Sequence, residues 1–256
     1  MAIRTLQKWH GAGNDFLVDV VEHGNEGFWT PELAREVLER QRGVGGDGLL
    51  IASVGSGRGV GMILFNADGS RAEMSGNGIR CLVAAVRRAT GLEEDEVRVT
   101  TDAGERLVRL HLDGDDGFGS VEMGEVSVLQ TPEGALGAVR VGNPHVVVAA
   151  PDHLELESLA RRAEEFSSLV GGANVEFIRE REGGLDLVVH ERGVGWTLAC
   201  GTGSVASAYV AHHLGWVGSK VVVRNPGGSL EVSLEGERAR LAGPVSFVAN
   251  VEWLAR

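Results

Sequence analysis

The stretch from Trp196 to Ala208 is WTLACGTGSVASA, and it contains one of only two cysteines in the 256-residue chain. Cys200 is followed directly by Gly-Thr-Gly and then by small and apolar residues. Glycine permits backbone angles that other residues resist, so this pattern predicts a sharp turn. The small residues behind the turn predict a helix that is packed on all sides.

A thiol at the start of such a helix has a distinctive environment. The first N–H groups of a helix have no partner within it, so they form a ready seat for a carboxylate. The positive end of the helix is also expected to lower the pKa of a cysteine there from about 8.5 toward neutrality. Cys200 is therefore a candidate base. The alternative is a buried structural cysteine before an ordinary helix, because short motifs often match by chance.

The same arrangement occurs a second time in the chain. Residues 74–85 are MSGNGIRCLVAA, with Ser75 in the place of Cys200. Two other segments also resemble each other, because GNDF (13–16) and GNPH (142–145) each open an apolar run. In each half the glycine turn follows at a similar distance. The repetition predicts two related halves, each with a helix N-terminus, that enclose one ligand between them.

Composition and charge restrict the class of protein. The chain is 43% hydrophobic and 23% charged, which is typical of a soluble globular protein, and its length allows two domains. It has no apolar run of about twenty residues and no signal-peptide core at its start, so we expect a cytoplasmic protein without a membrane partner. A net charge of -12 argues against a nucleic-acid partner. Two cysteines without metal-ligand spacing indicate neither a disulfide framework nor a metal site.

The order of predicted elements indicates an α+β fold. Strands outnumber helices and do not alternate regularly with them. Helices are predicted near 30–42, 77–90 and 200–214, and another from Pro151-Asp152 with Asp152 and Glu155 as a capping box. The chain is predicted to end with separate strands at 239–242 and 245–253. A Rossmann fold is not expected, because no G-x-G-x-x-G follows the first strand.

Several further motifs occur along the whole chain, and together they carry a resemblance. They are HGAGNDF (10–16), GGDGLL (45–50), FNADGS (65–70), GNPH (142–145), NVEF (174–177), ERGVG (191–195) and ACGTG (199–203). In this order and at compatible spacing they resemble diaminopimelate epimerases, which belong to a wider group of cofactor-independent amino-acid racemases that includes proline racemase.

The resemblance implies a specific architecture. It implies two pseudo-symmetric domains, each a β-rich, barrel-like shell around a central hydrophobic helix, with the active site in the cleft between them. The first domain would comprise residues 1–122 and be completed by a C-terminal strand at 245–256. The second would comprise residues 123–244. The family also suggests a homodimer.

The resemblance further implies an isomerase that interconverts L,L- and meso-diaminopimelate in lysine biosynthesis. In this family one cysteine removes the α-proton as a thiolate and another delivers a proton from the opposite side, without pyridoxal phosphate or any other cofactor. Carried over, Cys200 and Ser75 occupy the two cysteine positions, and His145 and Glu191 tune the acid–base pair.

The implied substrate-binding residues fall into two groups. Backbone donors for the α-carboxylate are Gly76, Asn77, Gly201 and Thr202. The polar ends of the substrate are assigned to Asn14, Asn66, Asn143, Asn174, Glu191 and Arg192, and bidentate pairing suits Arg192 to the distal carboxylate. On the residues alone, Asn14 and Asn66 are equally well interpreted as turn formers, and Glu191–Arg192 as a surface ion pair.

The departures from the family pattern matter as much as the matches. Ser75 stands where the family has its first cysteine, and a hydroxyl is a far weaker acid than a thiol. Cys81 is no substitute, because it lies about 9 Å further along the helix axis. Such a chain should bind substrate but epimerise it poorly, whether Ser75 is an engineered change or a natural one. A further departure is Trp196, where the family often has Glu.

Two alternatives therefore stay open. One is a racemase, epimerase or dehydratase for another amino acid such as a hydroxyproline, because related proteins with Ser or Thr at one position act on such substrates. The other is a catalytically silent amino-acid binding protein. A Schiff-base enzyme is not expected, because Lys8 and Lys220 are the only lysines and neither lies in a suitable motif.

Overall fold

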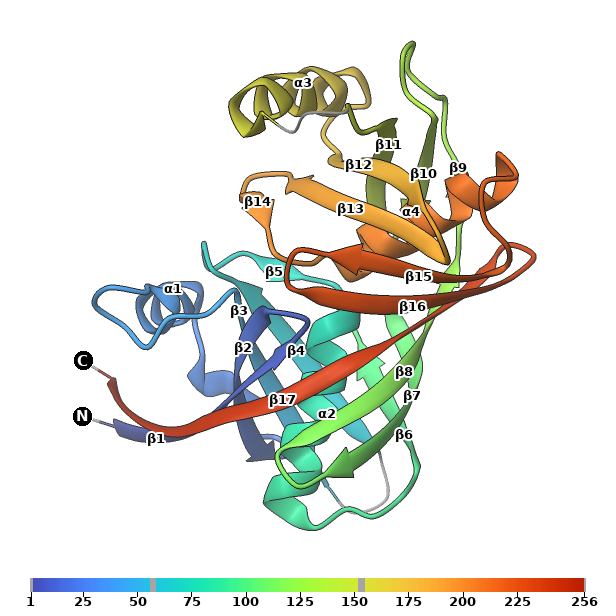
Figure 1. The fold of residues 1–256 in the computed structure, drawn as a ribbon. Coiled ribbons are helices and arrows are strands. Elements are labelled where there is room, and N and C mark those ends of the chain that lie inside the picture. Colours follow the sequence, from blue (N-terminus) through green and yellow to red (C-terminus); the bar gives the residue numbers. More distant parts are fainter. Residues whose placement is uncertain (1, 56–58, 152–154, 256) are drawn as a thin grey trace. The chain divides into compact units, whose positions relative to one another are not determined.

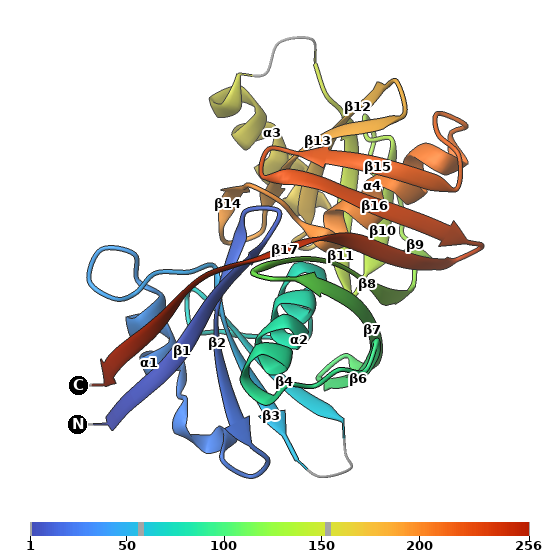
Figure 2. The same cartoon turned by 60° about the horizontal axis from the view of Figure 1, so that its bottom comes forward.

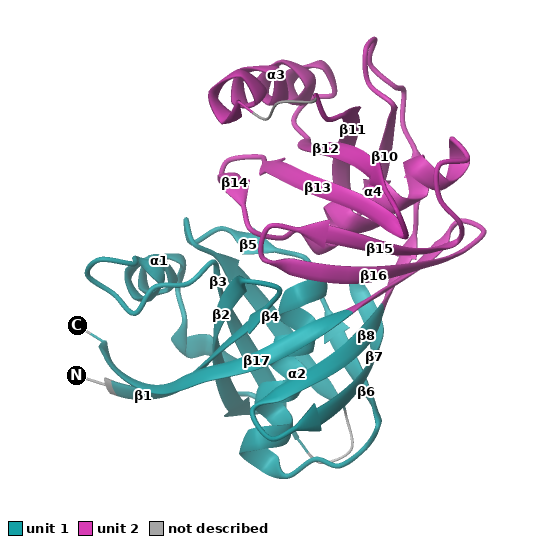
Figure 3. Ribbon diagram, in the orientation of Figure 1, with its two compact units in different colours: residues 1–121, 243–256 teal, residues 122–242 magenta. Residues whose placement is uncertain are grey.

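The structure is a computed structural model, and it describes residues 2–55, 59–151 and 155–255. The chain divides into two compact units (Figure 3). Unit 1 contains residues 1–121 together with residues 243–256, and unit 2 contains residues 122–242.

Within the described residues, unit 1 is a closed barrel of eight strands. In pairing order they are the later part of β17 (Arg238–Ala255), β1 (Ala2–Gly11), β2 (Asn14–Glu22), β3 (Gly48–Val54), β4 (Val60–Asn66), β6 (Glu96–Thr101), β7 (Gly104–Asp113) and β8 (Asp116–Glu125). The ring closes because β8 also pairs with β17. Outside this ring are the 3-10 turn η1 (Glu26–Phe28), the helix α1 (Pro31–Leu38) and the short strand β5 (Arg71–Ala72).

Helix α2 (Gly76–Thr90) runs through the ring of strands of unit 1 (Figure 2). Every residue from Gly76 to Val86 is buried, and apart from Asn77 and Arg80 these residues are small or apolar. Ser75 caps the start of the helix by accepting a hydrogen bond from the Gly78 amide. Gly91 ends the helix in the left-handed region at φ 72°, where glycine is favoured.

Unit 2 repeats this plan around helix α4 (Gly201–His213). In pairing order its strands are β9 (Ser127–Val128), β10 (Gly137–Val141), β11 (Asn143–Ala149), β12 (Asn174–Arg181), β13 (Gly184–Glu191), β15 (Lys220–Asn225), β16 (Gly228–Glu235) and the first part of β17. The three-residue strand β14 (Gly195–Thr197) pairs with β13. Helix α3 (Leu156–Leu169) lies outside the strands, on the opposite side from α4 (Figure 1).

The neighbouring strands β11 and β12 separate α3 from α4, and their side chains alternate between the two helices. Val146, Val148, Val175 and Phe177 pack in one cluster with the buried residues of α3. His145 on β11 and Asn174 and Glu176 on β12 occupy the alternate positions of these strands and therefore face α4. This alternation brings three polar side chains to the inside of unit 2.

The predicted fold class is confirmed, because the chain forms two similar units, each with strands around a central apolar helix. Two details differ. The strands predicted at 239–242 and 245–253 are one strand, β17, although Gly243 and Pro244 suggested a break. The third helix begins at Leu156, its cap Glu155 makes no side-chain bond, and Asp152 of the predicted capping box lies outside the described residues. Among the described helices, none has the length and apolar composition needed to cross a membrane.

Candidate functional site

The repeated glycine turns form two half-sites, one in each unit. The first half-site is the start of α2 with its surroundings and comprises Asn14, Ser75, Gly76, Asn77 and Arg80. The second is the start of α4 with its surroundings and comprises Asn143, His145, Asn174, Glu176, Glu191, Arg192, Cys200, Gly201 and Thr202.

Cys200 is the N-cap of α4, as the sequence predicted for a residue in front of Gly-x-Gly. Its Sγ accepts a hydrogen bond from the Gly203 amide at 3.3 Å and lies 3.4 Å from the Thr202 hydroxyl. The side chain is 6% exposed, so the thiol is buried but not sealed. The amides of Gly201 and Thr202 belong to the first turn, whose N–H groups have no partner within the helix. The thiol and these donors thus occupy the same end of α4.

Glu191 provides a carboxylate next to this thiol. It is the last residue of β13, and its Oε1 accepts a hydrogen bond from the Thr197 hydroxyl at 2.6 Å. The carboxylate lies close enough to Cys200 for the two groups to shift each other's pKa. Thr197 lies on β14, so the short hairpin of β13 and β14 holds Glu191 in place. This is a defined acid–base contact rather than a surface ion pair.

The pKa of Cys200 differs from the expectation drawn from the sequence. Burial raises the pKa of the Cys200 thiol well above its usual value, and the carboxylates of Glu191 and Glu176 raise it further. The hydrogen bonds from Thr202 and the Gly203 amide act in the opposite direction but are smaller. Burial also raises the pKa of Glu191. The expected lowering of the Cys200 pKa toward neutrality is therefore wrong, because this environment favours the protonated thiol, which can donate its proton.

A buried chain of three polar side chains lies beside Cys200. The Nδ1 of His145 is 2.7 Å from Oε1 of Glu176, and both side chains are completely buried. The Nε2 of His145 lies 3.0 Å from Oδ1 of Asn143. His145 and Asn143 were predicted site residues. Glu176 was not, although a glutamate at an inward position of the apolar run N-V-E-F-I is a signal that alternation reveals.

Asn174 links the thiol to the segment that carries Arg192. Its Nδ2 lies 3.9 Å from the Cys200 Sγ, and its Oδ1 accepts a hydrogen bond from the Arg192 amide at 3.0 Å. The guanidinium of Arg192 is exposed and makes one long contact, 3.4 Å, with the Gly172 carbonyl. A loosely held guanidinium of this kind retains donors for a second carboxylate.

Ser75 occupies in the first half-site the position that Cys200 occupies in the second. Its Oγ accepts from the Gly78 amide at 3.0 Å, the counterpart of the bond from Gly203 to Cys200. Among the described residues, no carboxylate or histidine forms a hydrogen bond with the Ser75 hydroxyl. The helix start is thus repeated, whereas the acid–base partners are found only in the second half-site.

The asparagines of the first unit are placed differently from one another. Asn77 donates to Oδ1 of Asn14 at 3.4 Å, and Asn14 donates to Asp47 at 2.8 Å, so Asn14 belongs to the first half-site. Asn66 instead forms a turn, because its side chain donates to Ser70 at 3.0 Å. The structure therefore places Asn14 at the helix start and Asn66 in the turn that follows β4.

Arg80 is a residue of this half-site that the sequence analysis missed. It is completely buried, and it donates to the Gly76 carbonyl at 2.8 Å and to Oδ1 of Asn77 at 2.9 Å. Among the described residues, no carboxylate pairs with it and its Nε has no partner. Burial lowers its pKa to about 10, which leaves it charged at neutral pH. The signal was an arginine within an otherwise apolar helix.

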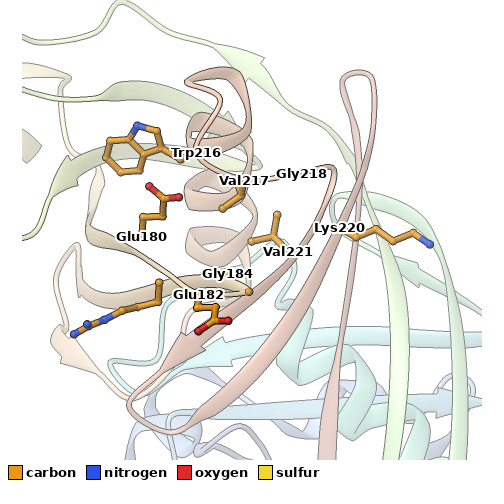
Figure 4. Close-up of a pocket in the computed structure, with 10 residues that line it drawn as sticks. Glu180, Glu182, Gly184, Trp216, Val217, Gly218, Lys220 and Val221 are labelled. Carbon is orange, nitrogen blue, oxygen red and sulfur yellow. The ribbon is translucent and has the colours of Figure 1, made fainter.

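A hollow of about 500 Å³ lies elsewhere in unit 2 (Figure 4). It is lined by the turn between β12 and β13, including Glu180 and Glu182, and by Trp216 and Lys220, which follow α4. The hollow is therefore near the C-terminal end of α4, whereas Cys200 caps the N-terminal end. None of the predicted site residues lines it.

The sequence is similar to proteins of one family over nearly its whole length. The pattern of the family described as Diaminopimelate epimerase matches residues 6–129 and 137–248. The diaminopimelate epimerase of Clostridium perfringens is 32% identical over 271 residues, which cover 97% of this chain and 99% of that protein. The diaminopimelate epimerase of Methanothrix thermoacetophila is 37% identical over 263 residues, which cover 95% and 93% respectively.

Solved structures with the same fold have little sequence in common with this chain. A predicted epimerase from Pseudomonas aeruginosa has a TM-score of 0.79 at 14% identity and covers 99% of this chain and 100% of its own. A hydroxyproline epimerase from Agrobacterium vitis has a TM-score of 0.76 at 16% identity, with 99% and 91% covered. These likenesses show the fold, and the sequence matches show the family: the chain belongs to the diaminopimelate epimerase family.

Proposed function

We propose that this chain is an isomerase that acts at the α-carbon of diaminopimelate and transfers a proton between its L,L and meso forms. The observation that carries the proposal is the second half-site, where a buried thiol caps a helix and contacts the carboxylate of Glu191. We infer further that both half-sites act on one substrate molecule. In support, the relatives that match this chain over almost their whole lengths are named diaminopimelate epimerases.

The helix starts suit the first requirement of the reaction, which is to hold an α-carboxylate. In this proposal the backbone N–H groups of Gly76 and Asn77 and those of Gly201 and Thr202 donate to it. Removing the α-proton increases the negative charge on the carboxylate, so these donors stabilise the transition state more than the bound substrate. The buried charge of Arg80 adds to this effect at α2.

Cys200 and Glu191 suit the second requirement, which is proton transfer. As an acid, the Cys200 thiol gives its proton to the carbanion and becomes a thiolate. As a base, it first passes its proton to the Glu191 carboxylate and then takes the α-proton of the substrate. The raised pKa of Glu191 favours this transfer, because the carboxyl group then holds the proton more readily, whereas the raised pKa of Cys200 opposes it.

Arg192 suits the third requirement, recognition of a second carboxylate. Its guanidinium is exposed and makes only one long contact, so it can form a bidentate pair with the distal carboxylate. Asn143 and Asn174 would contact the polar groups of the same substrate. A protein acting on proline or hydroxyproline has no distal carboxylate to bind, so Arg192 favours a dicarboxylic amino acid.

Ser75 limits proton exchange on one face of the substrate α-carbon. Without a neighbouring base, the hydroxyl of Ser75 is rarely ionised and exchanges protons slowly with the substrate carbon. We therefore propose that the chain exchanges the α-proton on the side served by Cys200 and epimerises poorly.

The experiment is α-proton exchange in D2O, followed by NMR, for L,L- and meso-diaminopimelate. We expect one isomer to exchange without inversion, and exchange to disappear in Cys200→Ala. Ser207→Ala is the matched control, because Ser207 is buried in the same helix but contributes nothing to the half-site. A protein that binds diaminopimelate but exchanges neither isomer is the silent binding protein. Loss of exchange in the control would show that the assay reports helix packing instead.

The cellular setting and assembly complete the proposal. We propose catalysis without pyridoxal phosphate, and in support the Lys8 ammonium is fixed by the Asp15 carboxylate at 2.9 Å.

We also propose a cytoplasmic homodimer in lysine biosynthesis. The exposed side chains of Ile3 and Leu254, which pair in register between β1 and β17, offer an apolar surface for a second copy. Sedimentation equilibrium tests the dimer. Complementation of a strain that lacks its own diaminopimelate epimerase, by the chain with Ser75→Cys, tests the pathway.

A further inference from the structure

The carboxylate of Glu176 is buried, and only one of its oxygens has a partner among the described residues. Its carboxylate is completely enclosed, and its Oε1 approaches Nδ1 of His145 at 2.7 Å. Its Oε2 has no hydrogen-bond partner among the described residues. The carboxylate also lies against the first turn of α4, because a Cβ added to Gly203 would be only 2.7 Å from Oε1.

Such an arrangement is costly for stability. A buried carboxylate with an unsatisfied oxygen is unfavourable, and replacing a buried ionic pair with apolar residues is often neutral or stabilising. The carboxylate at position 176 is therefore better explained by what it does to His145 than by packing.

The hydrogen bonds determine where the protons of His145 reside. The Oδ1 of Asn143 is a carbonyl oxygen and can only accept, so Nε2 of His145 must carry a proton. The Nδ1 atom then shares a second proton with Glu176, either as an imidazolium donating to a carboxylate or as a neutral ring accepting from a carboxyl group. In both cases Glu176 fixes the same ring orientation and the same Nε2–H donor.

The fixed donor in turn orients Asn143. Because His145 engages the carbonyl oxygen of the Asn143 side chain, the NH2 group of that amide is left to donate elsewhere. A rotation of the imidazole would release the amide and allow it to flip, which would present an acceptor in place of a donor.

We propose that Glu176 is a positioning residue of the second half-site, which acts through His145 to hold the Asn143 amide with its NH2 group available to substrate. The assignment to substrate binding rests on the proposed function, whereas the contact of Glu176 with His145 does not. Glu176 itself does not touch substrate, because its carboxylate is sealed behind His145 and the first turn of α4.

Two substitutions separate orientation from charge. Glu176→Gln keeps the shape and donates an N–H to Nδ1, so it leaves His145 neutral with its proton on Nε2. Glu176→Leu has a similar volume and makes no hydrogen bond. We expect the α-proton exchange of Glu176→Gln to stay within about threefold of the unchanged protein. Glu176→Leu should raise KM about tenfold, the size expected for one hydrogen bond to a charged group, with a smaller change in kcat.

A second measurement needs no substrate. In 15N-histidine NMR spectra, where His145 is identified by its absence in His145→Gln, we expect the Nε2–H form in the unchanged protein and in Glu176→Gln. In Glu176→Leu we expect a mixture of tautomers. If diaminopimelate neither binds nor exchanges, the proposed function fails, and these spectra still decide the role of Glu176.

A double-mutant cycle guards against simple misfolding. The effect of Glu176→Leu on KM should vanish in an Asn143→Ala background, because the two residues act through one amide. If Glu176→Leu does not fold, Glu176→Gln and Asn143→Ala provide the comparison. The proposal is overturned if Glu176→Gln is as impaired as a variant without the hydrogen bond, if His145 keeps one tautomer in Glu176→Leu, or if the two effects are additive.

Discussion

Ser75→Cys is the substitution with the largest expected gain of activity. The two helix caps have the same geometry: Ser75 Oγ accepts from Gly78 at 3.0 Å, and Cys200 Sγ accepts from Gly203 at 3.3 Å. A sulfur atom therefore fits at position 75 with the longer bond that its larger radius requires. The change supplies an ionisable thiol at the helix start that we propose to bind the carboxylate, where no carboxylate or histidine among the described residues forms a hydrogen bond with the cap residue.

The size of the gain follows from this deficit. A positioned general acid or base contributes roughly 10²–10⁴-fold to a proton transfer, which is about 3–5 kcal/mol of activation free energy. We place Ser75→Cys at the lower end, because no carboxylate or histidine among the described residues contacts position 75 to assist the thiol. The expected increase in epimerisation is therefore about 100-fold.

The assay is ¹H NMR in D2O, which follows exchange at the α-carbon and the appearance of the second isomer in the same spectra. The unchanged protein should exchange one isomer faster than it inverts it, whereas Ser75→Cys should do both at similar rates. The double variant Ser75→Cys, Cys200→Ser is the control and should lose inversion again. If the unchanged protein epimerises as fast as Ser75→Cys, the hydroxyl is a competent acid–base group and the reasoning fails.

Three further predictions concern the surroundings of the helix starts. Gly203→Ala places a Cβ 2.7 Å from Glu176 Oε1 and should lower the free energy of unfolding by about 1–3 kcal/mol, measured by denaturant titration. Gly78→Ala, whose added Cβ lies 3.1 Å from its nearest neighbour, should lower it by less. Equal losses in the two variants would contradict this prediction. Arg80→Met removes a buried charge that no carboxylate among the described residues pairs with, so the Tm should stay the same or rise. The affinity for diaminopimelate, measured by calorimetry, should fall about tenfold. A lower Tm with unchanged affinity would mean that Arg80 has a structural role instead. Because the Cys200 pKa is raised, the thiolate population and hence α-proton abstraction should still be increasing with pH above pH 9, and a rate that levels off near pH 7 would refute the titration argument.

The fold was largely predictable because it depends on patterns that repeat. The glycine turns before residues 76 and 201 and the two apolar helices recur at similar spacing, and this repetition indicated two equivalent units. The continuity of β17 was not predictable, because Gly243-Pro244 breaks most strands. Here the proline falls between the residues that pair with β16 and those that pair with β1, so its missing N–H interrupts neither of these two ladders.

The site was predictable where chemistry coincides with a turn, and less so inside strands and helices. Cys200 and Ser75 were found because glycine turns follow them, whereas Glu191 was assigned through the resemblance of the ERGVG motif to the family. Glu176 and Arg80 lie within regular elements, where local sequence indicates burial but not the partner. The error in the Cys200 pKa has a similar origin, since the helix start is visible in the sequence while the enclosure and the second carboxylate are products of the fold.

Arg80 and the His145–Glu176 pair give the two half-sites different electrostatic characters on the same scaffold. Arg80 lies one turn inside α2 and reinforces the positive end of that helix. Glu176 lies against the first turn of α4 and is paired with His145, while burial, followed by the carboxylates of Glu191 and Glu176, raises the pKa of Cys200 and so favours the protonated thiol. A carboxylate is therefore attracted most strongly to the half-site that lacks a thiol, and proton transfer is concentrated in the other. On this reasoning Ser75 impairs catalysis more than binding, because the anion-binding charge beneath it is intact.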